Sequence, residues 1–414
     1  MQKPDRVVDP ASPELARLRA DMSAPDPVLE TLSPSVEIYC VGGAVRDALM
    51  GRASADRDFV VVGATPESMV AAGFMPVGSD FPVFLHPRTH NEYALARTER
   101  KTGRGYKGFV FNADPSVSLS DDLLRRDLTV NAIALSCTGE LIDPFHGLHD
   151  LRSGCLRHIG PAFSEDPVRV LRLARFAARW PDFDVAAETM VLCRSMVEQG
   201  EVTALVAERV WQELAKGLVE ASPSRMIDIL QACGAWDELH PRIASVSKAA
   251  GRVLNHAATR RAPLEIAYAL LIHNLDGTPQ PADVFKAPKS CIDLAQQVLA
   301  QADAVDRVIT MVDHSPRQSV GPIFDWLMGC DVQRRPERFD RLLSVFELEG
   351  RLSEAHHQQL CNLASWLCGE EANRSAAQAA EHAVQHVAGN GGAVAQAVRE
   401  ARFAVFRTHP IFKA

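Results

Sequence analysis

The sequence lacks the features that mark membrane, secreted and zinc-ribbon proteins. No apolar run is long enough to span a bilayer, and the N-terminal segment has no hydrophobic stretch typical of a signal peptide. The nine cysteines stand singly, without a Cys-x-x-Cys pair or another metal-ligand spacing. We therefore expect reduced, mostly buried thiols in a cytoplasmic protein with no membrane contact.

An excess of positive charge is also missing, since the formal net charge is -8. This balance argues against a protein that binds nucleic acid over its whole surface, but it is compatible with a local cluster of Lys and Arg. The glycine-containing stretch "VGGAVRD" is neither a Walker motif nor a GxGxxG fingerprint, and no repeat of fixed period is evident along the chain.

The chain changes character along its length, and 414 residues are enough for roughly two to four domains. Residues 1–34 are rich in Pro, Asp and Ser and are predicted to form a mobile extension. Residues 35–150 alternate strand and helix patterns, whereas amphipathic helix patterns fill residues 151–225 and continue through residues 226–414. The sequence therefore predicts an α+β fold, with a small β-sheet and flanking helices followed by an all-helical remainder.

Local signals place the elements of the α+β part. Thr65 is a typical helix N-cap, followed by proline, and Gly73 ends the same helix. A Thr138-Gly139 turn favours a hairpin. The predicted strands are "VEIYCVGG", "DRDFVVVG", "FPVFLH" and "NEYALARTE", the helices are "AVRDALMG" and "TPESMVAAG", and the hairpin is "AIALSCTGELIDPF".

The stretch "VGGAVRD" is a candidate phosphate-binding turn. Gly42 and Gly43 lie between a predicted strand and a predicted helix, where free backbone N–H groups and the helix dipole favour anions. Arg46 adds a charged donor. An ordinary tight turn explains the two glycines equally well, so this motif is weak by itself.

The stretch "ADRDFVVV" places two carboxylates one residue apart. On a strand Asp56 and Asp58 share a face, where like charges repel each other unless a cation lies between them. Mg²⁺ takes one or two carboxylates together with substrate phosphates, so the pair predicts a metal site. A solvated strand start is the alternative. Glu92 is a candidate third carboxylate, although a lone Glu in a strand is often simply exposed.

The stretch "RRDLTVNA" combines charged and amide side chains. Asp127 and Asn131 are four residues apart and would share one face of a helix. The guanidinium groups of Arg125 and Arg126 suit polyphosphate oxygens. We therefore expect these four residues to bind a nucleotide, the alternative being an ordinary charged helix start.

The stretch "SEDPVRVLRLARFAAR" offers a base-reading pair. Asp166 is explained fully as a helix N-cap, but Arg169 lies one turn on, and an acceptor beside a donor would match cytosine and adenine while mismatching uracil and guanine. Arg172, Arg175 and Arg179 extend a basic stripe. We expect Arg172 to bind the nucleotide and the last two to bind a phosphate backbone, with a solvated helix face as the alternative.

Five motifs in a fixed order carry a family resemblance over about residues 36–240. They are "VGGAVRD", "DRDFVVVG", "RRDLTVNA", "DPFHGLHDL" and "EDPVRVLR", and as a set they resemble class II tRNA nucleotidyltransferases, the CCA-adding enzymes of bacteria. The resemblance implies that C, C and A are added to the tRNA 3′ end from CTP and ATP without a nucleic-acid template. It also implies release of pyrophosphate and a two-metal reaction with Mg²⁺ as cofactor.

The resemblance also implies a role for each part of the chain. Residues 35–150 match the nucleotidyltransferase head, residues 151–225 a helical neck with the base-selecting motif, and residues 226–414 a tRNA-binding body and tail. Asp56 and Asp58 match the catalytic metal ligands, and Glu92 matches a supporting carboxylate. The triphosphate loop is matched by Gly42, Gly43 and Arg46, and a phosphate- and ribose-binding motif is matched by Arg125, Arg126 and Asp127. The base-selecting motif is matched by Glu165, Asp166 and Arg169, and the next neck-helix motif by Glu208 and Arg209.

The C-terminal half departs from many proteobacterial members of that family, which carry a metal-dependent HD phosphohydrolase domain. In "AYALLIHNLDGTP" His273 is followed by Asn274, so the hard carboxylate ligand is missing. We therefore expect no intact phosphohydrolase motif. Three alternative functions stay open: a poly(A) polymerase, an enzyme that adds only CC or only A, and a non-catalytic RNA-binding protein.

Overall fold

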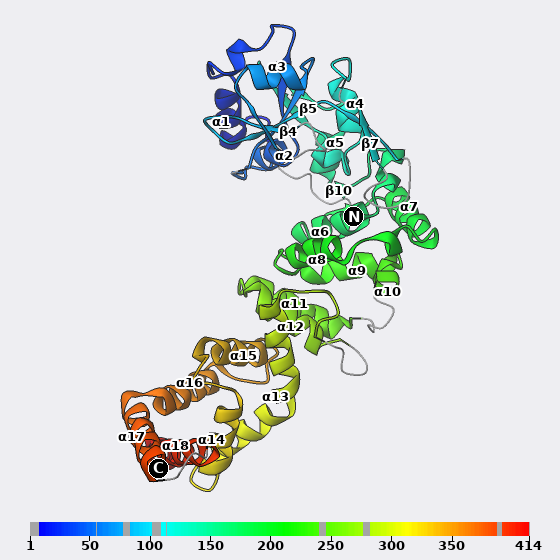
Figure 1. Cartoon of the computed structure of the whole chain (residues 1–414). Helices are drawn as coiled ribbons and strands as arrows, with labels where there is room; N and C mark the ends of the chain where they lie inside the picture. The colour runs from blue at the N-terminus through cyan, green and yellow to red at the C-terminus, as the bar shows by residue number, and fades with distance from the viewer. Residues whose placement is uncertain are drawn as a thin grey trace. The chain divides into compact units, whose positions relative to one another are not determined.

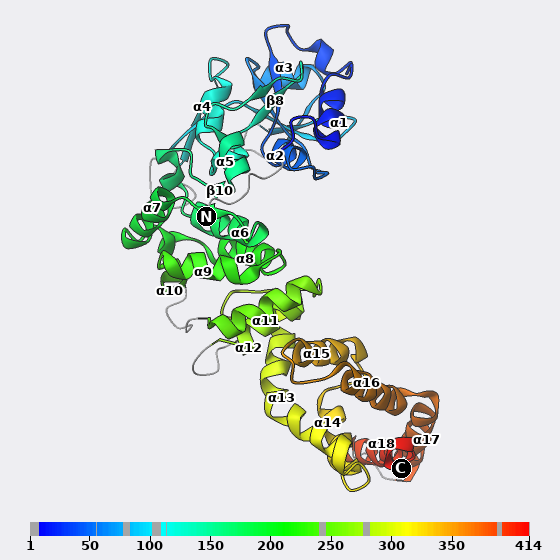
Figure 2. The ribbon, with the colours of Figure 1, turned by 180° about the vertical axis from the view of Figure 1, so that it is seen from behind.

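The computed structural model describes residues 8–54, 56–77, 83–101, 109–112, 114–239, 246–275, 282–386 and 391–413. The chain divides into two compact units, Met1–Arg242 and Ile243–Ala414 (Figures 1 and 2). The first unit contains a mixed β-sheet and helices, and the described residues of the second are mainly helical. The α+β architecture predicted from the sequence is confirmed.

A seven-stranded sheet with the order β3-β4-β5-β2-β1-β8-β9 forms the centre of the first unit. The central pair β2 and β5 is parallel, and the other neighbours run antiparallel. The strands are β1 (Glu37–Val41), β2 (Asp58–Val62), β3 (Met75–Val77), β4 (Val83–Leu85), β5 (Glu92–Leu95), β8 (Ala134–Ser136) and β9 (Leu141–Ile142). Two small sheets pair β6 (Thr98–Lys101) with β7 (Phe109–Asn112) and β10 (Cys155–Leu156) with β11 (Asp184–Val185).

The predicted signals place most of these elements correctly. The β8–β9 hairpin turns at the predicted residues, and Thr65 caps its helix in a reciprocal capping box with Ser68. The apolar residues Phe59, Val60 and Val61 of β2 are all buried, which anchors the strand that begins at Asp58. The helical segments of this part are α2 (Gly43–Leu49), α3 (Pro66–Ala71), α4 (Leu119–Leu124), α5 (Gly147–Ser153), η1 (Leu29–Thr31) and η2 (Thr129–Asn131).

The predicted mobile N-terminal extension is wrong for residues 8–34. Helix α1 (Pro13–Met22) packs against α2, and its Leu15 and Leu18 are buried. The Ser12 hydroxyl caps α1 and donates a hydrogen bond to the Ala48 carbonyl at 2.7 Å. The apolar side of α1 therefore covers the head, although the composition of this segment is that of a linker.

A helical layer follows the sheet in the same unit. Its helices are α6 (Val168–Arg179), α7 (Ala187–Glu198), α8 (Ala207–Leu218), α9 (Pro223–Ala232) and α10 (Ala235–Leu239), with η3 (Pro161–Glu165) and η4 (Val202–Ala204) between them. Helix α6 packs on both α8 and α9. A Cβ added at Gly217 would lie 2.0 Å from Met226 Sδ, so a larger residue there would displace the buried Met226 side chain between α8 and α9. The predicted boundary after residue 225 falls inside α9, whereas the compact unit ends at Arg242.

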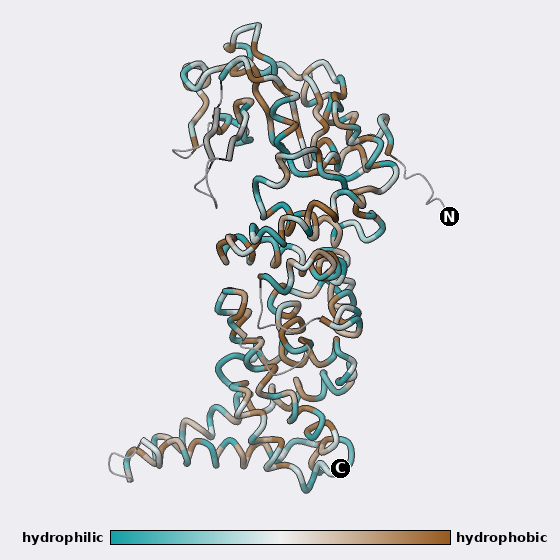
Figure 3. Tube along the Cα trace, turned by 90° about the vertical axis from the view of Figure 1, so that its right-hand side faces the viewer, coloured by the Kyte–Doolittle hydropathy of each residue, from teal (hydrophilic) through white to brown (hydrophobic). Residues whose placement is uncertain are grey.

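The second unit consists of packed helices in its described part. They are α11 (Lys248–Thr259), α12 (Leu264–His273), α13 (Lys289–His314), α14 (Val320–Gly329), α15 (Pro336–Leu348), α16 (Glu354–Cys368), α17 (Glu370–His386), α18 (Gly391–Phe406) and η5 (Pro410–Phe412). Hydrophobic and hydrophilic residues alternate along them (Figure 3). Among the residues that the structure describes, no helix combines the length and the apolar character needed to cross a lipid bilayer.

Candidate functional site

A pocket of about 700 Å³ lies in the first unit and collects most of the predicted site residues. Loops of the sheet supply one wall, and helices α6 and α8 supply the other. Of the fifteen site residues proposed from the sequence, all but Glu92 line this pocket: Gly42, Gly43, Arg46, Asp56, Asp58, Arg125, Arg126, Asp127, Asn131, Asp166, Arg169, Arg172, Arg175 and Arg179. Segments that lie more than 150 residues apart in the sequence therefore meet in one cavity.

The glycine turn after β1 is shaped by close contact with an arginine. Gly42 has φ +68°, and a Cβ added there would lie 3.1 Å from Arg126 Nη1. A side chain at this position would be strained and would also push Arg126 out of the pocket wall. Arg125 and Arg126 are in turn tied to the fully buried Asp122, by bonds of 2.7 and 3.2 Å.

Arg46 of α2 is fixed by three different elements. It contacts the Asn131 side chain, donates from Nε to Asp47 at 2.8 Å, and lies 4.8 Å over the ring of Trp180 at the end of α6. Asp47 also accepts from Arg179 at 3.0 Å. These contacts join the glycine turn to α6, so the two walls of the pocket share one polar network.

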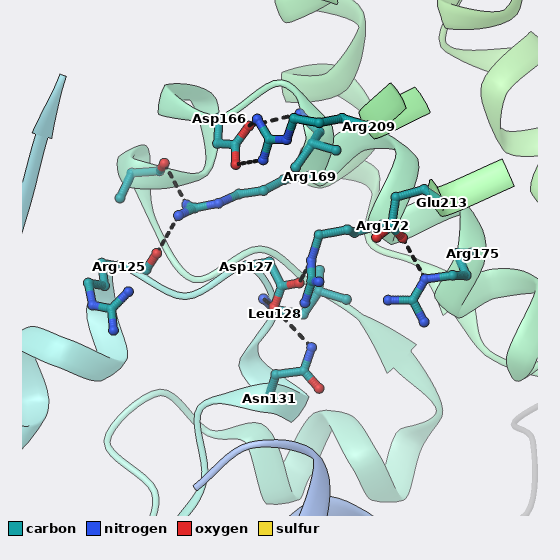
Figure 4. Close-up of polar contacts among 12 residues, drawn as sticks. Arg125, Asp127, Leu128, Asn131, Asp166, Arg169, Arg172, Arg175, Arg209 and Glu213 are labelled. Carbon is teal, nitrogen blue, oxygen red and sulfur yellow. Dashed lines mark hydrogen bonds and ion pairs between the residues drawn. The ribbon is translucent and has the colours of Figure 1, made fainter. Parts of the chain in front are cut away.

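The buried Asp127 lies at the centre of this network (Figure 4). Its carboxylate accepts from Asn131 Nδ2 at 2.9 Å and from Arg172 Nε at 2.7 Å. Burial opposes ionisation, but Arg172 and the Asn131 hydrogen bond outweigh it and hold the pKa of Asp127 well below its usual range. The attraction of Asp127 likewise raises the pKa of Arg172. Both side chains are therefore charged at neutral pH.

The predicted helix over "RRDLTVNA" is wrong, although the contact deduced from it exists. Helix α4 ends at Leu124 with Arg125 as its C-cap, and a single 3₁₀ turn, η2, covers Thr129–Asn131. Asp127 bends back to bond both the Leu128 N–H and Asn131. The short side chain of Asp competes with helix formation by bonding nearby backbone groups, which explains the difference.

Asp166 and Arg169 lie at the start of α6, where the sequence places them (Figure 4). The two oxygens of Asp166 accept from Nη1 and Nη2 of Arg209 at 3.0 and 2.8 Å, and Oδ1 also accepts from the Val168 N–H at 3.2 Å. Arg169 donates to the carbonyls of Ala162 and Arg125, each at 2.6 Å. Both ends of the expected donor–acceptor pair are thus held in fixed orientations.

The basic stripe of α6 is not a solvated helix face. Arg175 is buried and donates to Glu213 of α8 at 2.5 Å, while Arg179 is paired with Asp47. Three stacked or tilted rings at the end of α6, Phe176, Trp180 and Phe183, support the stripe from behind. The alternative of a solvated face is therefore wrong for these arginines.

Asp56 and Asp58 differ from the other carboxylates of the pocket. Asp127, Asp166 and Glu213 each form an ion pair with an arginine. Within the described part of the chain, no ion pair or side-chain hydrogen bond is seen for either Asp56 or Asp58. Burial raises the pKa of Asp58, Arg126 opposes it, and the charge of Asp56 raises it further. This pair is the one acidic feature of the described pocket without a matching cation.

Glu92 is adjacent to the pair without joining it. It is exposed and stands opposite Asp58 in the parallel register of β2 and β5. The carboxylate oxygens of Glu92, Asp56 and Asp58, all three described residues, do not gather into a common ligand cluster, and Glu92 does not line the pocket.

The pocket as a whole carries an excess of positive charge. Eight arginines and Lys216 face five carboxylates, an excess of four positive charges. An empty cavity with such an excess favours a polyanion. The sequence reasoning named Arg209 only as part of a neck-helix motif and did not single out five other lining residues: Val168, Phe176, Gln212, Glu213 and Lys216. Positions 209, 212, 213 and 216 recur at helical spacing along "ERVWQELAK", which is the signal that could have identified one pocket-facing side of α8.

Two family models match the chain, one within the first unit and one mostly within it. The model described as "Poly A polymerase head domain" matches residues 38–157, and the model described as "Probable RNA and SrmB- binding site of polymerase A" matches residues 182–246. Both matches therefore lie on the sheet and the helical layer that form the pocket.

Close relatives extend over most of the chain. The Multifunctional CCA protein of Leptothrix cholodnii is 47% identical over 410 residues, which cover 89% of this chain and 96% of the relative. The CCA-adding enzyme of Bordetella bronchiseptica is 51% identical over 310 residues, covering 75% of this chain and 82% of the relative.

Solved structures share the fold. The Bacillus stearothermophilus CCA-adding enzyme in complex with CTP superposes with a TM-score of 0.66 at 24% identity, covering 96% of this chain and 93% of the other. The Thermotoga maritima CCA-adding enzyme complexed with tRNA gives a TM-score of 0.64 at 20% identity, covering 97% and 93%. At this identity the likeness concerns the fold.

Proposed function

This chain belongs to the family of CCA-adding enzymes, and from that premise we propose how its pocket joins CMP and AMP to the 3′ end of a tRNA. The chain adds C, C and A from CTP and ATP, releasing pyrophosphate and using no nucleic-acid template. The observation that carries the proposal concerns Asp56 and Asp58, which form no ion pair with any residue that the structure describes, in a pocket whose other carboxylates are all paired with arginines.

Asp56 and Asp58 are the proposed ligands of Mg²⁺. Their carboxylates suit a hard cation that also takes phosphate oxygens, and burial together with the charge of Asp56 raises the pKa of Asp58, so a bound cation would favour its ionised form. Two bound ions would supply stabilisation of the attacking 3′-oxygen and of the leaving pyrophosphate oxygen. Glu92, next to Asp58 in the sheet, is the proposed supporting carboxylate.

The triphosphate is proposed to lie against the arginine wall of the pocket. Arg46 approaches from α2, Arg125 and Arg126 approach from the end of α4, and Arg172 approaches from α6. A nucleoside triphosphate carries about four negative charges, which the cationic excess of the pocket would balance. Ion pairs with Asp47, Asp122 and Asp127 already hold these arginines, so the guanidinium groups are oriented before the nucleotide arrives.

Base selection is proposed to rest on Asp166 and Arg169. Cytosine and adenine both present an exocyclic amine beside a bare ring nitrogen, so a carboxylate acceptor and a guanidinium donor serve both bases. Arg209 holds the Asp166 carboxylate with two bonds, and two backbone carbonyls hold Arg169. The tRNA phosphates near the primer end are the proposed ligands of Arg175 and Arg179.

The second unit is proposed to bind tRNA without phosphohydrolase activity. His273 Nδ1 and Asn274 Nδ2 both lie 2.7 Å from Glu349 Oε1, so both side chains bond the same carboxylate oxygen within the protein. An amide at position 274 lacks the negative charge with which a carboxylate holds a hard metal ion. Release of phosphate from a 2′,3′-cyclic nucleotide by the purified protein would contradict this part of the proposal.

One experiment tests the function and separates it from its alternatives. A tRNA that lacks its CCA end is incubated with Mg²⁺ and with CTP, ATP or both, and the 3′ ends are sequenced. Ends in CC with CTP alone and in CCA with both nucleotides support the proposal. A long A tail with ATP alone would indicate a poly(A) polymerase, and an unchanged end would indicate a non-catalytic RNA-binding protein.

A further inference from the structure

A second cluster of metal-ligand side chains lies in the second unit, on two adjacent helices. Asp340 belongs to α15, and His357 and Cys361 belong to α16, where their spacing of four residues places them on one face. One ligand atom of each residue lies within 4.8 Å of the other two. Among the residues that the structure describes, this is the single group of three such side chains.

The separations fit a tetrahedral metal ion. His357 Nε2 lies 3.1 Å from Asp340 Oδ1, and Cys361 Sγ lies 3.7 Å from the same oxygen. Zinc bonds of about 2.0 Å to oxygen and nitrogen and about 2.3 Å to sulfur give tetrahedral edges of about 3.3 Å for O–N and about 3.5 Å for O–S. Each observed distance is within a few tenths of an ångström of these edges.

The hydrogen bonding of His357 also requires a positive charge at this point, carried either by a protonated ring or by a metal ion. Its Nδ1 lies 2.5 Å from Glu347 Oε2, the arrangement in which Nδ1 donates to a carboxylate. In the neutral ring Nε2 is then a bare acceptor, yet it faces Asp340 Oδ1, a second acceptor. Two acceptors at hydrogen-bond distance require either a proton or a metal ion between them. A carboxylate behind the histidine is also the usual support of a metal-bound imidazole.

We propose that Asp340, His357 and Cys361 form a Zn²⁺ site that links α15 to α16. Three protein ligands leave the fourth tetrahedral position to water, and Glu347 fixes the His357 ring. A thiolate ligand favours Zn²⁺ over Mg²⁺, which prefers oxygen ligands, so the site is chemically distinct from the Asp56–Asp58 pair. The proposal does not depend on the nucleotidyl-transfer function.

Metal titration of the full-length protein tests the site. Protein stripped with a chelator is titrated with Zn²⁺ against a competing chromophoric chelator, and separately with Co²⁺ while the thiolate-to-cobalt charge-transfer absorption is recorded. We expect Cys361→Ser to abolish that absorption and both Cys361→Ser and His357→Ala to weaken Zn²⁺ binding at least tenfold. Glu347→Gln should weaken it by about 10- to 100-fold, as loss of an outer-shell partner does.

His356 provides the matched control. It is the neighbour of His357 on α16, and it bonds Asp313 at 3.0 Å and Ser353 rather than the cluster. His356→Ala should leave Zn²⁺ affinity and the cobalt absorption unchanged. The proposal is overturned if the wild type binds Zn²⁺ no more tightly than Cys361→Ser. It is equally overturned if His356→Ala and His357→Ala weaken Zn²⁺ binding alike. That result would show that His357 makes no specific contribution to metal binding. A proton between His357 and Asp340 would then explain their contact.

Discussion

Removal of the Arg209 side chain should reduce base discrimination more than it disturbs the fold. In the wild type the Asp166 carboxylate is held by two bonds from Arg209, of 3.0 and 2.8 Å, and by one backbone N–H at 3.2 Å. In Arg209→Ala only the backbone bond of these three remains, so the acceptor proposed to read the base amine can rotate. A well-oriented bidentate contact gives about 1–3 kcal/mol of discrimination. Its loss should therefore lower the preference for CTP over UTP by about 5- to 150-fold.

The assay is the ratio of kcat/KM for CTP and UTP on a tRNA that lacks its CCA end. Arg209→Lys keeps the positive charge but cannot form two parallel bonds, so it should also lose discrimination. The control is Arg194→Ala, since Arg194 lies on α7 outside the pocket and donates to the Ala232 carbonyl. A folded Arg209→Ala variant whose CTP preference stays within twofold of wild type would refute the reasoning.

Three further predictions concern other parts of the first unit. The folded-state pKa of Asp58 is raised, so the free energy of unfolding falls as the pH rises through this pKa. Asp58→Asn should therefore raise the Tm of the metal-free protein at pH 7, while it abolishes CMP transfer. A lower Tm would contradict this prediction. Glu213→Ala leaves the buried Arg175 without its nearest carboxylate and should lower the free energy of unfolding in urea by about 3 kcal/mol, whereas a change below about 1 kcal/mol would show that the pair is not buried in solution. Asp21 of α1 forms an ion pair of 2.6 Å with Arg57, the residue between the two candidate metal ligands in the sequence. Asp21→Ala should therefore raise the Mg²⁺ concentration that gives half the maximal rate by about two- to fivefold. An unchanged Mg²⁺ concentration would assign α1 no role in the site.

Local sequence patterns located most strands of the large sheet, but they missed β3 and merged β5 and β6 into one strand. The apolar run after Asp58, the cap at Thr65 and the turn at Thr138-Gly139 all act over a few residues, and each appears in the structure. The four-residue spacing of Asp127 and Asn131 suits a helix. The Asp127 side chain instead accepts a hydrogen bond from the backbone N–H of Leu128, and the segment forms a 3₁₀ turn.

Contacts between distant segments were the part that the sequence could not supply. No local pattern relates Arg209 to Asp166 or Glu213 to Arg175, because each pair is formed only when α8 packs on α6. For the same reason α1 was mistaken for a mobile segment, since its two buried leucines are covered by the head rather than by neighbours in sequence. Cys361 likewise has no ligand spacing to another cysteine and meets Asp340 only through the packing of α15 on α16.

The central claim is that the unpaired Asp56 and Asp58 hold the metal on which nucleotidyl transfer depends. Its most direct test is the single-turnover rate of CMP transfer to a tRNA lacking CCA, at saturating CTP and Mg²⁺, for Asp56→Asn and Asp58→Asn. Loss of about 4 kcal/mol of metal-dependent stabilisation predicts a fall of about a thousandfold for each variant, with tRNA binding retained. A rate within tenfold of wild type for either variant would contradict the account.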